Sequence, residues 1–152
     1  MHVLDVMTQA GVTDTPEDTL SSAADRMWRQ QTGSLIVMDE AKLVGIVTER
    51  DVLRAVARGV DPTTTTVRDA MSTDVITVGP NALLRDAARE MAHRWIRHLP
   101  VVSGDEIVGM VSMRDVTGVF AALSRDPDSV ELSHDELVRE RRLVRIEPGD
   151  LD

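Results

Sequence analysis

The chain has 152 residues, of which 42% are hydrophobic and 28% charged, and this composition excludes a disordered, collagen-like or coiled-coil chain. The length fits one ordinary domain or two small modules that share a core. A formal net charge of −9 and only three aromatic residues, two Trp and one Phe, argue against nucleic acid and anionic membranes as partners.

The sequence repeats itself in a register that aligns Val3 with Val67, without a gap as far as Val52 and Val116. Each copy opens with Val-x-Asp-x-Met and closes with Gly-h-h-Thr/Ser-x-x-Asp, where h is apolar. Apolar, glycine and charged positions all agree in this register, so we interpret it as an internal duplication.

After the opening segment of the first copy, Gly11-Val12-Thr13 and Pro16 predict a short strand that ends before a helix. The helix is predicted from residues at helical spacing, which are Leu20, Ala23, Ala24, Met27 and Trp28. The apolar runs Ser34 to Met38 and Leu43 to Thr48 predict a hairpin. A second helix is expected after Thr48, a capping residue type with Asp51 three positions on.

The second copy predicts the same β-α-β-β-α order. Its elements are the stretch Val75-Ile76-Thr77, a helix carrying Leu84, Ala87, Ala88, Met91 and Trp95, strands Leu99 to Ser103 and Ile107 to Ser112, and a helix capped by Ser112 and Asp115. We therefore expect one repeat at residues 1–60, a linker at 61–66, a second repeat at 67–123, and a tail at 124–152 with a short helix from Ser133 to about Arg142. About sixty residues make a thin core, so the repeats should pack together.

Each closing motif places a hydroxyl, a guanidinium and a carboxylate where a strand meets a helix. These residues are Thr48, Arg50 and Asp51 in the first copy and Ser112, Arg114 and Asp115 in the second. Helix N–H groups attract anions, a carboxylate can accept hydrogen bonds from a ribose diol, and arginine can clamp phosphate. The pattern therefore suggests a mononucleotide site. The alternative is that these residues only cap helices, which local grounds alone favour because such motifs are common.

The β-α-β-β-α order, the opening motif and the closing motif together resemble the CBS domain, here as a tandem pair (Bateman module) from Val3 to Leu123. The stretch Arg97-His98-Leu99-Pro100-Val101 also resembles the family's phosphate-contacting region. The resemblance implies an α+β fold of two repeats packed with pseudo-two-fold symmetry. It further implies a regulatory protein, not an enzyme, that binds an adenine nucleotide or adenosyl ligand in clefts between the repeats.

The resemblance assigns ribose to Asp51 and Asp115, and phosphate to Arg97 and His98. The full set of expected ligand-binding residues is Val12, Thr13, Ser34, Ile46, Thr48, Arg50, Asp51, Ile76, Thr77, Arg97, His98, Met110, Ser112, Arg114 and Asp115. Candidate ligands are AMP, ADP, ATP and S-adenosylmethionine, and no cofactor is required. Because the first copy has Gly33-Ser34 where the second has Arg97-His98, we expect unequal affinities, with the Ser112–Asp115 site the stronger.

The resemblance also implies a homodimer, formed through helix faces around Ala55-Val56 and Val119-Phe120, and an unknown effector protein as partner. The alternative is a ligand-free structural or stress-related interaction protein whose own side chains close the clefts. No nucleophile with an acid–base partner is identifiable, and the four histidines share no metal-ligand spacing. The absence of cysteine, of a secretory signal and of a long apolar run predicts a cytoplasmic protein without a membrane segment.

Overall fold

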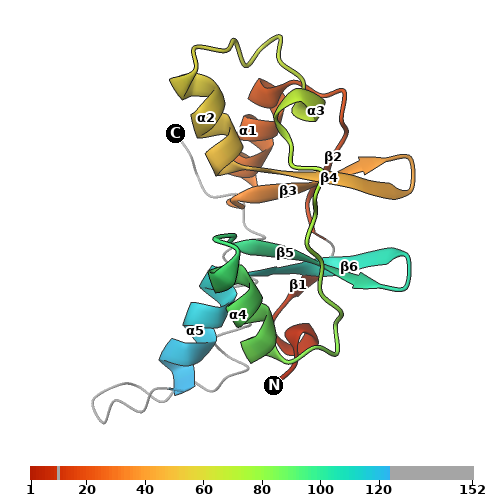
Figure 1. Cartoon of the computed structure of the whole chain (residues 1–152), viewed down its shortest axis with the longest axis vertical. Coiled ribbons are helices and arrows are strands. Elements are labelled where there is room, and N and C mark those ends of the chain that lie inside the picture. The colour runs from red at the N-terminus through yellow and green to blue at the C-terminus, as the bar shows by residue number, and fades with distance from the viewer. Residues whose placement is uncertain (10, 124–152) are drawn as a thin grey trace. The chain divides into compact units, whose positions relative to one another are not determined.

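The computed structural model describes residues 1–9 and 11–123, and these form two compact units (Figure 1). Residues 11–75 make up the first unit. Residues 1–9 and 76–123 make up the second unit. Each unit contains one three-stranded sheet with helices packed on it, so the expectation of a duplicated α+β fold is confirmed.

The first unit contains the sheet β2-β3-β4, in which β2 is parallel to β3 and β3 is antiparallel to β4. Its elements are β2 (Thr13–Asp14), α1 (Leu20–Arg29), β3 (Ser34–Asp39), β4 (Lys42–Thr48), α2 (Glu49–Ala57) and α3 (Val67–Ala70). Helix α1 begins where the Thr19 hydroxyl accepts a hydrogen bond from the Ser22 N–H at 3.1 Å. The buried core of this unit consists of Leu20, Ala23, Met27, Leu35, Val37, Val47, Ala55 and Val67.

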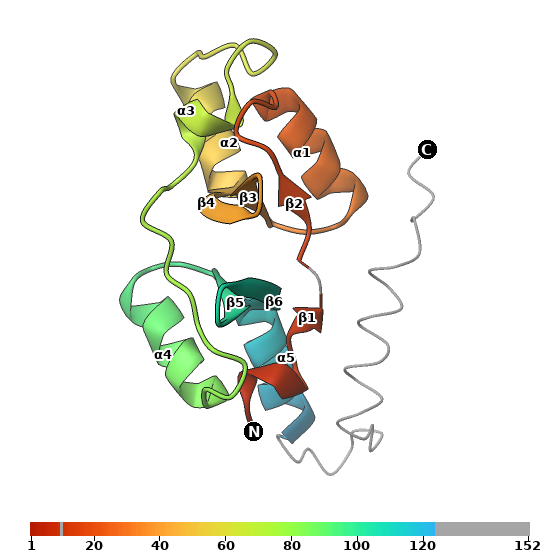
Figure 2. The same ribbon diagram turned by 90° about the vertical axis from the view of Figure 1, so that its right-hand side faces the viewer.

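The second unit contains the sheet β1-β6-β5, with both strand pairs antiparallel. Its elements are η1 (Val3–Asp5), β1 (Thr8–Gln9), α4 (Leu84–His93), β5 (His98–Ser103), β6 (Glu106–Ser112) and α5 (Met113–Leu123). The view in Figure 2 shows β1 lying along β6. The buried core consists of Val3, Val6, Met7, Leu84, Ala87, Met91, Leu99, Val101, Val111 and Val119.

The compact units do not coincide with the sequence repeats, because the opening segment of each repeat is built into the unit formed by the other. Val3 donates its N–H to the carbonyl of Ala82 at 2.9 Å, and the aligned Val67 donates to Asp18 at 2.8 Å. Both valines are fully buried. The Val-x-Asp-x-Met motif therefore forms a short helical turn that covers the core of the unit it joins.

The repeated glycine of the closing motif allows the opening segment of the other repeat to pass close to the strand that carries the glycine. A Cβ built on Gly109 would lie 2.4 Å from the carbonyl oxygen of Thr8. A Cβ on Gly45 would lie 2.5 Å from Sδ of Met71 and 3.0 Å from the carbonyl oxygen of Ser72. The glycine and the methionine thus recur together because the segment that carries the methionine passes directly over the glycine.

Several sequence-based expectations differ from the structure. Trp28 and Trp95 share helical spacing with core residues, but they are 66% and 83% exposed. Helix α4 ends at His93, and Trp95 adopts a left-handed φ of 57°, which turns it off the helix face. In the second copy the expected short strand is reduced to a single bridge between Val78 and Val101. The expected tail helix lies outside the described residues.

Candidate functional site

In the first unit, the junction between β4 and α2 holds a hydroxyl and a carboxylate together. Asp51 accepts hydrogen bonds at Oδ2 from the backbone N–H of Thr48 at 2.8 Å and from its hydroxyl at 3.1 Å. Asp51 is only 8% exposed. These bonds fix the orientation of the carboxylate and satisfy the start of the helix, so the predicted capping box is confirmed here.

The junction between β6 and α5 in the second unit repeats this geometry. Asp115 accepts at Oδ2 from the backbone N–H of Ser112 at 2.8 Å and from its hydroxyl at 2.6 Å. Its own N–H donates to Oγ of Ser112 at 3.3 Å. Ser112 and Asp115 are 3% and 9% exposed, so this cap is also buried and the prediction holds for both copies.

Each hairpin brings the start of its first strand beside the helix start. Ser34 pairs with Thr48, and His98 pairs with Ser112. Directly paired residues on antiparallel strands project on the same face with Cβ atoms about 5 Å apart. The Ser34 hydroxyl is buried and has no hydrogen-bond partner among the described residues. The first junction therefore contains a buried polar atom whose hydrogen-bonding capacity is not used within the described chain.

Burial separates these junctions from an ordinary helix cap. The same capping box occurs at the start of α3, where Asp69 accepts from the Thr66 hydroxyl at 2.8 Å, but this pair is exposed to solvent. Capping therefore does not require burial. The buried polar or charged residues of the described chain are Asp14, Ser34, Asp51, Ser112 and Asp115, and all but the first lie at the two junctions.

The two junctions differ at the second carboxylate oxygen. Oδ1 of Asp51 accepts a hydrogen bond from Nη2 of Arg54 at 2.5 Å. The repeat register aligns Arg54 with Gly118, which has no side chain to reach Asp115. Arg54 is not among the ligand-binding residues expected from the sequence, although its alignment with a glycine is a visible difference between the copies.

The other expected ligand-binding residues divide between the units. In the first unit, Val12 precedes β2, Thr13 lies in β2, Ile46 lies in β4 opposite Ser72, and Arg50 lies in the first turn of α2. Their roles toward a ligand stay predictions.

In the second unit, Ile76 and Thr77 precede the bridge at Val78. Met110 is buried in β6, where it pairs with Thr8 on one side and Pro100 on the other. The remaining expected residues of this unit are Arg97 before β5, His98 at its first position, and Arg114 in the first turn of α5. The carbonyl of Arg97 accepts from the N–H of Met113 at 2.9 Å, which holds the start of β5 against α5.

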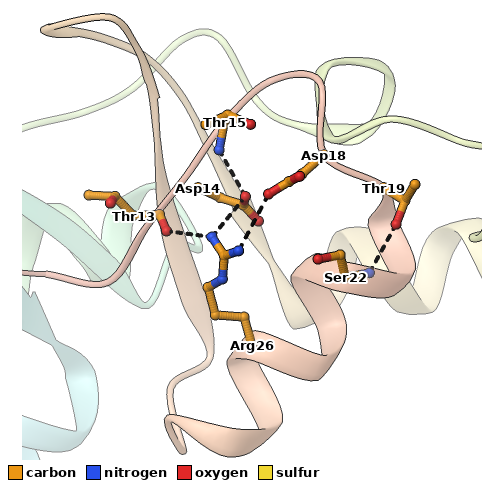
Figure 3. A network of polar contacts seen from close by, with 7 residues as sticks. All are labelled: Thr13, Asp14, Thr15, Asp18, Thr19, Ser22 and Arg26. Atoms are coloured by element: carbon orange, nitrogen blue, oxygen red, sulfur yellow. Dashed lines mark hydrogen bonds and ion pairs between the residues drawn. The ribbon is translucent and has the colours of Figure 1, made fainter.

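A second polar cluster in the first unit surrounds Asp14, which is 3% exposed (Figure 3). Its Oδ1 accepts from the N–H of Thr15 at 2.8 Å and from Nη1 of Arg26 at 3.0 Å. Arg26 also donates to the carbonyl of Thr13 and to Asp18, at 2.9 and 3.4 Å. Oδ2 of Asp14 has no partner among the described residues.

Burial raises the pKa of Asp14 from 3.8 to about 6, and the neighbouring Asp18 adds to the increase. The N–H of Thr15 and the positive charge of Arg26 oppose it, but they do not compensate for the loss of water. Asp14 is not among the functional residues expected from the sequence. The available signal was the repeat register, which places Asp14 where the second copy has Val78.

Within residues 1–9 and 11–123, no cluster of three or more histidine or acidic side chains is arranged to hold a metal ion. In the same part of the chain, every helix is too short or too polar to cross a membrane.

Comparison with known proteins shows similarity along both repeats. The CBS domain profile matches residues 3–58 and 67–122. The chain is 37% identical over 115 residues to the CBS domain-containing protein YhcV of Bacillus subtilis, covering 75% of this chain and 81% of that protein. It spans only 57%, 29% and 52% of three other curated relatives.

Solved structures of CBS-domain proteins are also similar to this chain. The CBS domain pair of protein MJ0100, in complex with 5′-methylthioadenosine and S-adenosyl-L-methionine, superposes with a TM-score of 0.74 at 27% identity, covering 80% of this chain and 96% of that chain. The hexameric CBS-CP12 protein from bloom-forming cyanobacteria superposes with a TM-score of 0.73 at 30% identity, covering 82% and 76%. With both repeats matched by the family profile, the chain belongs to the CBS domain family and carries two CBS domains in tandem.

Proposed function

We propose that this CBS pair is a regulatory module that binds an adenine nucleotide or related adenosyl compound at its Thr48–Asp51 and Ser112–Asp115 junctions. The observation that carries the proposal is the burial of the cap carboxylate at both junctions, Asp51 and Asp115, where capping alone does not require it. The adenosyl ligands bound by the CBS pair of MJ0100 support the choice of ligand class.

The cap geometry suits a sugar diol. Because Oδ2 of each carboxylate is held by its own helix start, the second oxygen is the one that a ribose hydroxyl would bond. The unpartnered hydroxyl of Ser34 would supply a further hydrogen bond in the first unit. In the second unit, Arg97 and His98 would contact phosphate, which makes the Ser112–Asp115 site the stronger one for a nucleotide. The proposal includes no catalytic step.

Isothermal titration with AMP, ADP, ATP and S-adenosylmethionine tests this proposal. Asp51→Ala and Asp115→Ala should each remove one site, because each deletes the acceptor for the ribose. Asp69→Ala is the matched control, since it breaks the same kind of helix cap at an exposed position. Absence of binding by the unaltered protein to all four compounds, or equal loss in the control, would contradict the proposal.

Signalling would pass through a homodimer to an effector protein. The apolar residues Val56 and Phe120 occupy aligned positions on α2 and α5 and are 61% and 73% exposed, as an interface requires. The expected dimer interface also included Ala55 and Val119. This part of the expectation is wrong, because both residues are buried in the cores of their own units. Analytical ultracentrifugation of Val56→Glu and Phe120→Glu should show monomers where the unaltered protein is dimeric; a monomeric unaltered protein would refute this part.

The second candidate is a structural interaction protein that needs no ligand. The ion pair between Arg54 and Asp51 favours it for the first junction, since a side chain of the protein already occupies the carboxylate. The isothermal titration described above distinguishes the two candidate functions. A structural protein would bind none of the four compounds, and Asp51→Ala would leave its association with a partner unchanged.

A further inference from the structure

Arg54 occupies the oxygen of Asp51 that a sugar would use. At both junctions Oδ2 is taken by the helix cap, which leaves Oδ1 for a ligand. In the first unit Oδ1 accepts from Nη2 of Arg54 at 2.5 Å. In the second unit α5 has Gly118 at the aligned position, so no arginine side chain reaches Asp115 from that turn of the helix.

The first junction nevertheless retains a polar group without a hydrogen-bond partner in the described chain, the hydroxyl of Ser34. Ser34 is 2% exposed and lies beside Thr48 in the hairpin register. A buried hydroxyl without a partner destabilises the folded protein unless something else binds it. A ligand at this junction would satisfy Ser34 but would have to displace or share Arg54.

We propose that Arg54 is an affinity-determining residue, which competes with a sugar hydroxyl for Asp51 and makes the first site weaker than the second. This inference rests on the proposed function. The Arg54 side chain is 48% exposed, so its release to water is possible and its bond to Asp51 is partly screened. Displacing such a bond should weaken binding about fivefold, the factor that corresponds to about 1 kcal/mol.

Adenosine and AMP are the probes, because adenosine carries the sugar without the phosphate. In an Asp115→Ala background, where only the first site remains, Arg54→Ala should tighten adenosine binding about fivefold in isothermal titration. In an Asp51→Ala background, Gly118→Arg should weaken adenosine binding at the second site by a similar factor. Gly118→Ala is the control for the loss of a helical glycine and should leave that affinity unchanged.

The outcomes separate this inference from the function on which it rests. If the unaltered protein binds neither probe, the proposed function fails and this inference fails with it. If the first site binds adenosine with the same affinity after Arg54→Ala, the inference alone is overturned. It is also overturned if Arg54→Ala weakens AMP binding, because Arg54 would then hold the phosphate and not compete for the carboxylate.

Discussion

Replacing Asp14 by valine should remove a pH-dependent instability from the first unit. Asp14 is buried in β2, at the position where the second copy carries Val78. Its carboxylate has one oxygen bonded to Thr15 and Arg26 and the other without a partner in the described chain. Valine has a similar volume and no charge, so Asp14→Val should fit the site and be more stable than the unaltered protein at pH 7.5.

The magnitude follows from proton linkage. The pKa of Asp14 is about 6 in the folded protein against an ordinary value of 3.8, so the folded state holds the proton more tightly. This group therefore stabilises the fold most below pH 3.8, and that contribution is lost as the pH rises through 6. A pKa difference of about 2, at about 1.4 kcal/mol for each pH unit, gives a total of about 3 kcal/mol, of which about 2 kcal/mol falls between pH 4 and pH 7.5.

Urea unfolding of both proteins at a series of pH values measures this contribution. The free energy of unfolding of the unaltered protein minus that of Asp14→Val should fall by about 2 kcal/mol from pH 4 to pH 7.5. Taking the difference cancels the titration of the shared groups that do not interact with Asp14. Val78→Ala is the control, because it retains Asp14 and should keep the pH profile of the unaltered protein. A difference that stays constant over this range would refute the reasoning.

Three further substitutions test the packing and the ion pair. Gly109→Ala should lower the free energy of unfolding by about 2 kcal/mol, measured by urea unfolding, because the new methyl group meets a backbone oxygen at 2.4 Å. Gly45→Ala should lower it less, because its nearest neighbour is the flexible side chain of Met71; equal losses would contradict this reason. Arg26→Met should destabilise the protein by about 2 kcal/mol at pH 7.5 and by less at pH 4.5, where Asp14 is protonated in the folded state. A pH-independent loss would show that the Arg26 charge is not what matters.

The sequence was sufficient for the longer helices and the two hairpins because their signals are local. Apolar periodicity identified α1 and α4, and paired apolar runs identified both hairpins. The capping boxes at Thr48 and Ser112 were also predictable, because they depend on two residues three positions apart. These features need no knowledge of which segments meet in space.

Features that depend on tertiary contacts were not predictable in the same way. The exchange of opening segments between the repeats rests on long-range hydrogen bonds such as Val3 to Ala82, which no local pattern encodes. The early end of α4 left Trp95 exposed although its spacing matched the core face. The ion pair of Arg54 with Asp51 required the geometry of α2, because arginine three residues from aspartate is common on solvent-exposed helices.

Native mass spectrometry of the purified chain incubated with AMP or S-adenosylmethionine tests the central claim most directly. We expect adducts of up to two ligand molecules for each chain, reduced to one by either Asp51→Ala or Asp115→Ala and absent when both are combined. The Asp69→Ala protein should retain the adducts of the unaltered chain. An unaltered chain that carries neither compound would contradict the account.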